Sequence, residues 1–150
     1  MPSLLRTSSA NPDFIQLVKL LDQELAVRDG DEHPFYDQFN KIDNIRYVVI
    51  AYENEKSLAC GALKEYAPGI MEIKRMFTDP EVRGKGVATK VLNELIQWAK
   101  EMNYQKCILE TGIRQPDAIR LYQKNGFTSI PNYGQYAGVE NSVCFEMELL

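Results

Sequence analysis

The hydrophobic residues of the chain follow a strand-like pattern in its first half. β-branched and aromatic residues form runs over positions 47–52, 57–65 and 71–78, separated by short turns rich in polar residues, proline or glycine. Runs of this composition are typical of strands, and short turns between consecutive strands favour antiparallel pairing. The pattern therefore predicts an antiparallel meander, with a further short strand at 4–7.

Helical spacing replaces this pattern elsewhere. Apolar residues recur every three or four positions over 84–103, which predicts a long helix with one buried face. A similar stripe over 12–30 follows an asparagine-proline-aspartate sequence, which supplies an N-cap and a proline at the first helical position. Shorter helices are predicted at 34–40 and 116–124, and Gly126 ends the second of them.

The order of these elements indicates the fold class. Strands are also predicted at 106–111, 128–130 and 142–149, so the meander is followed by a helix, a strand, a helix and two strands. A meander combined with a crossover helix predicts an α+β fold with one mixed, mostly antiparallel sheet flanked by helices. A chain of 150 residues with no repeat or linker is expected to form a single domain over residues 1–150.

Composition and charge narrow the classes of function. The net charge is −4 and the pI is about 5.1, values that argue against a general nucleic-acid binder. No apolar run is long enough for a membrane span, and no secretory signal pattern opens the chain. Cys60, Cys107 and Cys144 lie apart in apolar stretches, which predicts buried side chains without a disulfide or metal site, and a cytoplasmic location.

One junction between a strand and a helix carries candidate chemistry. Residues 76–83 lead from the third strand of the meander into Gly84-Lys85-Gly86, at the start of the long helix. The first amides of a helix are unpaired and partly positive, and glycine lets the backbone approach a ligand closely. With Arg83 beside it, the loop predicts a phosphate or pyrophosphate site. A glycine turn before an ordinary surface helix has the same pattern, and Walker A and dinucleotide-binding fingerprints are not completed.

Two motifs together carry a family resemblance. Arg83, Gly86 and Ala88 match the pattern R/Q-x-x-G-x-G/A, and residues 118–127 match A-x-x-L-Y-x-x-x-G-F on the following predicted helix. In this order and on these elements, they resemble the motifs of GNAT (GCN5-related N-acetyltransferase) enzymes, particularly small bacterial members. The resemblance covers most of the chain. It departs at Gln115, where many relatives carry asparagine.

The resemblance implies a fold, a co-substrate and a set of contacts. It implies a GNAT fold and an N-acetyltransferase that passes acetyl from acetyl-CoA to a primary amine of a small molecule or peptide, by direct attack in a ternary complex. In the family, the strand before the loop pairs with the pantetheine arm, which implies a β-bulge or a splay between strands. The residues implied to contact the cofactor are Met76, Phe77, Thr78, Arg83, Gly84, Lys85, Gly86, Val87, Ala88, Thr89, Gln115 and Tyr122.

Direct attack needs one group that takes a proton from the amine and another that protonates the leaving thiolate. Amines with a pKa of about 10 arrive mostly charged, so a general base is required. Glu72 is one candidate, at a spacing that resembles the base of the histone-acetyltransferase branch, and Glu110 on a neighbouring predicted strand is another. The resemblance implies that Tyr122 is the general acid, because a phenol is protonated at neutral pH. A solvent-facing carboxylate and a packing tyrosine are the plainer interpretations of Glu72 and Tyr122.

The acceptor pocket is harder to predict, because loops far apart in sequence assemble it. The lone histidine has the plainer interpretation of a solvated loop residue, and the tyrosines of segment 132–136 could be turn residues. Strand alternation places Glu72 and Lys74 on one face of their strand and Arg75 on the other. The residues expected to line the pocket are His33, Phe35, Tyr36, Lys74, Tyr133 and Tyr136.

The sequence leaves three functions to weigh. They are an active N-acetyltransferase, a non-catalytic acyl-CoA-binding regulatory module, and an unrelated nucleotide-phosphate-binding protein. Retention of Glu72 and Tyr122 beside the glycine loop favours catalysis, because a module that only binds could lose both. The expected partners are acetyl-CoA and an amine acceptor, with no metal, nucleic acid or membrane, in a monomer or a homodimer.

Overall fold

The computed structural model describes residues 2–29 and 45–149 of the chain. Within these residues, seven strands form one sheet in the order β1-β2-β3-β4-β5-β7-β6. All neighbouring strands are antiparallel except β4 and β5, which are parallel. The predicted α+β fold with one mixed, mostly antiparallel sheet is therefore confirmed. The strands are β1 (Ser3–Thr7), β2 (Tyr47–Glu53), β3 (Lys56–Ala67), β4 (Ile70–Thr78), β5 (Lys106–Gly112), β6 (Thr128–Ile130) and β7 (Ser142–Glu148).

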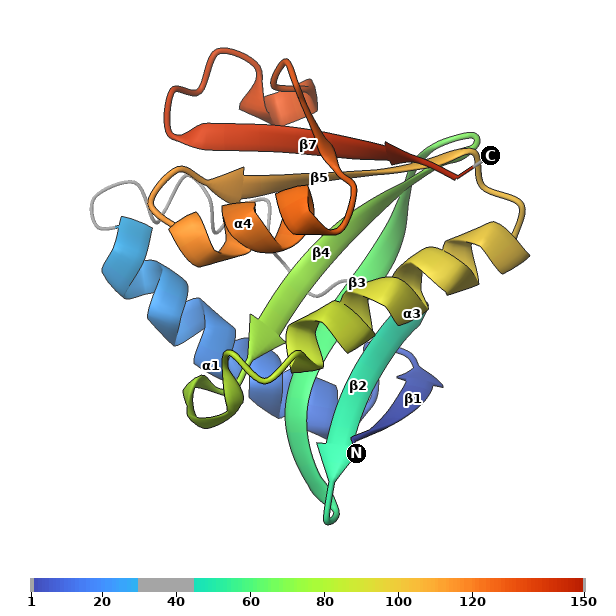
Figure 1. Cartoon of the computed structure of the whole chain (residues 1–150), viewed down its shortest axis with the longest axis vertical. Helices are drawn as coiled ribbons and strands as arrows, with labels where there is room; N and C mark the ends of the chain where they lie inside the picture. Colours follow the sequence, from blue (N-terminus) through green and yellow to red (C-terminus); the bar gives the residue numbers. More distant parts are fainter. Residues whose placement is uncertain (1, 30–44, 150) are drawn as a thin grey trace.

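Helices cover both faces of the sheet (Figure 1). α1 packs with β2 and β3 in one hydrophobic cluster, and α3 and α4 pack on the opposite face in a second, larger cluster. The predicted helix at 34–40 lies outside the described residues. The described helices are α1 (Pro12–Asp29), α3 (Val87–Glu101) and α4 (Pro116–Lys124), with short 3₁₀ turns at η2 (Pro80–Val82) and η3 (Gly134–Tyr136).

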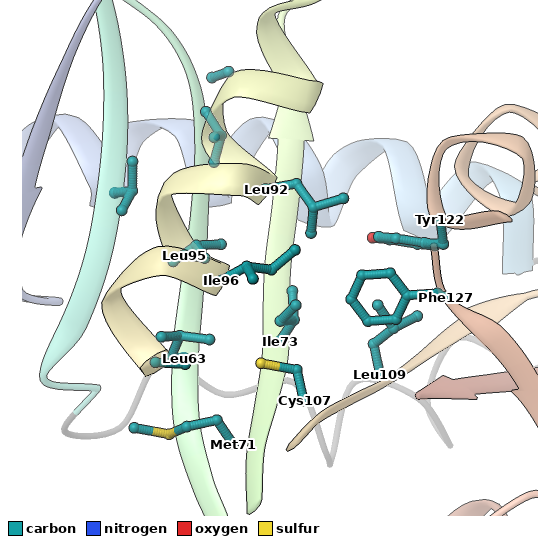
Figure 2. Close-up of a cluster of buried hydrophobic side chains, with 14 of the residues drawn as sticks. Leu63, Met71, Ile73, Leu92, Leu95, Ile96, Cys107, Leu109, Tyr122 and Phe127 are labelled. Atoms are coloured by element: carbon teal, nitrogen blue, oxygen red, sulfur yellow. The ribbon is translucent and has the colours of Figure 1, made fainter. Parts of the chain in front are cut away.

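The larger core fixes the position of α3 and α4 on the sheet. Leu92 and Leu95 of α3 are fully buried in one cluster with Met71 of β4 and Leu109 of β5 (Figure 2). Burial of each such side chain contributes about 1.5–3 kcal/mol to stability. The apolar stripe of the predicted helix thus faces the core, and it anchors the loop that precedes α3.

The long helix begins later than the pattern predicts. A start at Gly84 is wrong, because Gly84 and Gly86 have φ angles of 82° and 83° and α3 begins at Val87. Residues in this left-handed conformation do not continue a right-handed helix, and glycine adopts it without steric cost. The two glycines therefore form the loop, and they leave the first amides of α3 at its open end.

Gly61 of β3 leaves room for the side chain of Met76 on β4. A Cβ atom at this position would lie 2.5 Å from Met76 Sδ and 2.7 Å from Leu95 Cδ1. We expect Gly61→Ala to lower the free energy of unfolding by about 1–3 kcal/mol, because overpacking displaces buried side chains. Urea unfolding curves measure the change. Adding Met76→Ala should recover part of the loss, and an unchanged midpoint in the single variant would contradict the expected clash.

The cysteines Cys60, Cys107 and Cys144 are all buried and none is in a disulfide, as predicted. Burial raises the pKa of the Cys60 and Cys107 thiols to about 12, so both stay protonated and unreactive at neutral pH. Within the described residues, no group of three or more His, Cys, Asp or Glu side chains is placed to hold a metal ion. No helix in that part of the chain has the length and apolar character needed to cross a membrane.

Candidate active site

The strands β4 and β5 separate part-way along their length. Only residues 70–72 of β4 pair with β5, at positions 106–108. Figure 1 shows the two strands diverging from this point, with α4 beside the opening. Backbone groups beyond the paired segment that face the opening are not used by the other strand, so they can pair with a ligand. The splay that the family resemblance implies is therefore present.

A β-bulge interrupts β4 beside this opening. Phe77 pairs with Cys60 and Lys74 pairs with Ala62, so β4 has one more residue than β3 in this interval. Arg75 lies in the bulge with a φ angle of 58°, and its carbonyl oxygen accepts a hydrogen bond from the Cys60 thiol at 3.4 Å. The chain thus has both the bulge and the splay that the resemblance implies.

The bulge also changes the direction of the Arg75 side chain. Strand alternation would place Arg75 on the face opposite Lys74, and this expectation is wrong. Lys74 pairs with Ala62, which is buried with α1, and the Arg75 guanidinium donates to Asp22 of α1 at 2.7 Å. The extra residue breaks the alternation, so both basic side chains lie on the face that α1 covers.

A cavity of about 800 Å³ occupies the opening. Its walls include Leu21 and Leu25 of α1 on one side of the sheet, and Ala118 and Tyr122 of α4 on the other. The cavity therefore connects the two faces through the gap between β4 and β5. The predicted site residues in its walls are Glu72, Lys74, Met76, Phe77, Thr78, Arg83, Gly84, Gly86, Val87, Ala88, Thr89, Glu110, Gln115, Tyr122 and Tyr136.

Some predicted site residues are not in these walls. Lys85, between the two glycines of the loop, is exposed and does not line the cavity. Tyr133 does not line the cavity, and its hydroxyl donates a hydrogen bond to Glu72, which does. His33, Phe35 and Tyr36 lie outside the described residues.

Arg83 is held by several neighbours at the mouth of the glycine loop. Its Nε donates to the Thr78 carbonyl at 2.9 Å, and another guanidinium nitrogen donates to Glu24 of α1 at 2.7 Å. The guanidinium lies 5.7 Å from the centre of the Phe77 ring. The amides at the start of α3 offer open donors to an anion, and the Arg83 guanidinium lies beside them with Glu24 as its counterion.

Glu72 is a buried carboxylate held on two sides. Its Oε2 accepts a hydrogen bond of 2.6 Å from the Tyr133 hydroxyl, and its Oε1 lies 3.7 Å from Lys74 Nζ. The side chains of Glu72 and Lys74 are each only 9% exposed, so this ion pair is largely shielded from solvent. Glu110, the second candidate base, lies on β5 and lines the same cavity.

Two tyrosines border the carboxylates. Burial and the nearby charge of Glu110 raise the pKa of both Tyr122 and Tyr136, so both phenols hold their protons at neutral pH. Figure 2 shows the Tyr122 hydroxyl pointing from α4 toward Leu92 of α3. Tyr122 can therefore donate a proton to a group seated between α3 and α4.

Tyr133 belongs to an aromatic group beside Glu72. Its ring packs edge-on against Tyr66 and Tyr136, with centroids 5.2 Å and 5.9 Å away. Burial and the charge of Glu72 raise the pKa of Tyr133, which keeps the hydroxyl a donor to that carboxylate. Tyr133 thus contacts the base candidate, whereas Tyr136 lines the cavity itself.

Sequence reasoning missed several residues of the cavity wall. Leu21, Glu24 and Leu25 come from α1, which carries no site motif. Arg120 and Lys124 line the wall from α4, and their spacing of four on a helix is a signal that could have placed them on one face. The α1 residues gave no such signal, because their place depends on tertiary packing alone.

Comparison with known proteins identifies the family. A model of the acetyltransferase (GNAT) family matches residues 14–127, which is more than half of the chain. The chain belongs to the GNAT family. As a GNAT member it is an acyltransferase that uses acetyl-CoA as co-substrate.

Three known proteins illustrate what this GNAT enzyme is similar to. It is 29% identical over 155 residues to an IAA acetyltransferase from Azospirillum brasilense, with 98% of this chain and 97% of that protein covered. A solved structure from Klebsiella pneumoniae subsp. pneumoniae, which bears the name acyl-CoA N-acyltransferase, is 26% identical with a TM-score of 0.84, covering 100% and 99% of the two chains. A GNAT family acetyltransferase from Elizabethkingia anophelis with acetyl-CoA bound has the same fold at 19% identity, with a TM-score of 0.69 and 98% and 97% coverage.

Proposed function

We propose that this GNAT enzyme transfers the acetyl group of acetyl-CoA to a primary amine of a small molecule or peptide, by direct attack in a ternary complex. The observation that carries the proposal is that one cavity holds the glycine loop, a protonated tyrosine and two carboxylates. An anion site, a general acid and a general base are the groups that direct acetyl transfer requires. The acceptor and its path of attack are part of this proposal.

The cofactor is proposed to enter from the face that α3 and α4 cover. Its pyrophosphate would meet the amides at the start of α3, with Gly84 and Gly86 allowing close backbone approach. Its pantetheine arm would lie in the opening beside β4, where backbone groups of residues 73–78 are not used by β5. Gln115 lies in the same wall and keeps both amide functions that asparagine offers in many relatives.

The acceptor is proposed to reach the thioester from the face that α1 covers. Glu72 or Glu110 takes a proton from the ammonium group, either directly or through water. The amine nitrogen then bonds to the carbonyl carbon, and the carbon–sulfur bond breaks as the tetrahedral intermediate collapses. Tyr122 gives its proton to the departing thiolate, and the attacking nitrogen loses its second proton to solvent. Charge and protons therefore balance without a metal or a second cofactor.

Replacement of each carboxylate distinguishes the two base candidates. We expect the glutamine variant of the base, Glu72→Gln or Glu110→Gln, to lower kcat by about 10²–10⁴-fold, because an amide cannot accept the amine proton. The other variant should keep a kcat close to that of the wild type and mainly change KM for the amine. Glu146→Gln, on β7 outside the cavity walls, is the matched control. A kcat close to that of the wild type in both cavity variants would contradict a carboxylate base.

Titration calorimetry with acetyl-CoA, followed by a panel of amines assayed by release of free thiol, tests the proposed function. Saturable binding and amine-dependent thiol release are the expected results. Binding without thiol release by any small amine or amine-bearing peptide would favour the non-catalytic acyl-CoA-binding module. Absence of binding by the folded protein would refute the proposed function outright.

A further inference from the structure

An ion pair between a buried arginine and a partly exposed aspartate, whose side chain is 39% exposed, joins the bulge of β4 to helix α1. Arg75 donates from a terminal guanidinium nitrogen to Asp22 Oδ1 at 2.7 Å, and the Arg75 side chain is 3% exposed. These two residues are separated by 53 positions in the chain, so the pair exists only in the folded protein. No sequence motif includes either residue. The acid-base chemistry proposed above uses neither of them.

Arg75 occupies its position at an energetic cost. Its φ angle of 58° is in the left-handed region, which glycine adopts freely and other residues adopt under strain. Its Nε is buried, with no hydrogen-bond partner among the described residues, and a buried unsatisfied donor opposes folding. The backbone angle and the unsatisfied donor therefore both make arginine unfavourable at this position. The contact with Asp22 is the interaction that offsets these costs.

The bulge determines how β4 faces the cavity. The Arg75 carbonyl accepts from the Cys60 thiol in place of a regular ladder bond, and beyond it the register resumes with Phe77 opposite Cys60. Arg75, Met76, Phe77 and Thr78 line the cavity where the proposed thioester lies. A small rotation of the bulge would change the direction of every amide along this edge. Stabilisation of a developing oxyanion depends strongly on that direction.

We propose that Arg75 is a positioning residue, held by Asp22, that fixes the bulge so that the β4 amides facing the cavity polarise the thioester carbonyl. The proposal rests on the proposed function, since it concerns the same cavity. Arg75 does not touch the reacting atoms in this role. It acts through the backbone that it anchors to α1.

The experiment measures how strongly the protein polarises the thioester carbonyl of bound acetyl-CoA, and it needs no amine acceptor. The infrared stretching frequency of acetyl-CoA labelled with ¹³C at the thioester carbonyl is recorded free and bound to the protein. In the wild type we expect the bound frequency to be lower than the free one, because hydrogen bonds to the oxygen weaken the carbon–oxygen bond. Arg75→Ala and Asp22→Asn should lose most of this shift while calorimetry shows acetyl-CoA affinity close to that of the wild type. With an amine substrate, kcat should fall about tenfold with little change in KM for acetyl-CoA.

Two further variants distinguish a positioning role of Arg75 from a general effect on the stability of the fold. Arg75→Gly accepts the left-handed φ angle without strain but lacks the guanidinium, so it stays folded and should still lose the shift. Lys106→Gln breaks an ion pair between β5 and β7 away from the cavity walls, and should keep the shift. A full shift in Arg75→Gly and Asp22→Asn, or a lost shift in Lys106→Gln, would overturn the positioning role. Wild type that binds acetyl-CoA without any shift would also overturn it, and wild type that does not bind at all would refute the proposed function with it.

Discussion

Replacement of Gly86 by glutamate is expected to weaken acetyl-CoA binding by more than about 100-fold. Gly86 is the N-cap of α3, with a φ angle of 83°, and a Cβ atom added there would meet no atom within 4 Å beyond its chain neighbours. The new side chain would extend from the loop where the pyrophosphate is proposed to lie, and it would add a negative charge there. Like charges at close range repel, and the side chain would also prevent close backbone approach. Titration calorimetry with acetyl-CoA measures the loss.

Gly138 offers a matched control for this variant. It has a φ angle of 78° and likewise open space around the position of a Cβ atom, but it does not line the cavity. Gly138→Glu therefore introduces the same charge and similar backbone strain at a position away from the glycine loop. We expect it to bind acetyl-CoA like the wild type. Equal losses in both variants would show that strain, and not the anion site, explains the result at Gly86.

Removal of one hydroxyl group is expected to stop most turnover. Tyr122→Phe should lower kcat by about 10²–10⁴-fold, because the leaving thiolate loses its proton donor, while affinity for acetyl-CoA changes little. The raised pKa of Tyr122 means that its proton stays bound at pH values where a free tyrosine, with a pKa of about 10, would lose it. The wild-type rate should therefore not fall at about pH 10, where a free phenol would lose its proton. Thiol release measured against pH for both proteins tests this.

Tyr104 provides the comparison for this variant. Its hydroxyl donates to Glu65 at 2.7 Å on the surface, outside the cavity walls. Tyr104→Phe removes the same atom and should leave kcat unchanged. If Tyr122→Phe keeps wild-type turnover while it remains folded, another group must protonate the thiolate and the proposed role of Tyr122 is wrong.

The parts of the site that lie close together in sequence could be predicted. The loop 83–86 and the helix at 116–124 have local signals in the sequence, two glycines beside basic residues in one and a proline start with a glycine end in the other. Their chemistry follows from helix ends and from residue type, which are local properties. The strands of the meander were predictable for the same reason, because each has its own composition.

The parts that depend on distant contacts could not be predicted. Nothing in the local sequence marks Arg75 for a left-handed bulge, since glycine, the usual residue for such an angle, is absent there. The contact between Tyr133 and Glu72 joins residues 61 positions apart, and it depends on the segment between β6 and β7 approaching β4 in the folded chain. The role of α1 in the cavity wall likewise follows from packing. Periodicity gives the buried face of a helix, but not which residues approach a gap in the sheet.

The contact between Glu24 and Arg83 has a consequence for turnover. The Glu24 carboxylate already accepts a hydrogen bond of 2.7 Å from the Arg83 guanidinium. A cofactor pyrophosphate would approach the same guanidinium. An arriving diphosphate would thus exchange one anion for another on Arg83, so the electrostatic gain is smaller than for an unoccupied cation. The same exchange in reverse returns Glu24 to the guanidinium as spent coenzyme A departs. A carboxylate on a neighbouring helix would in this way act as a counterion that limits product retention.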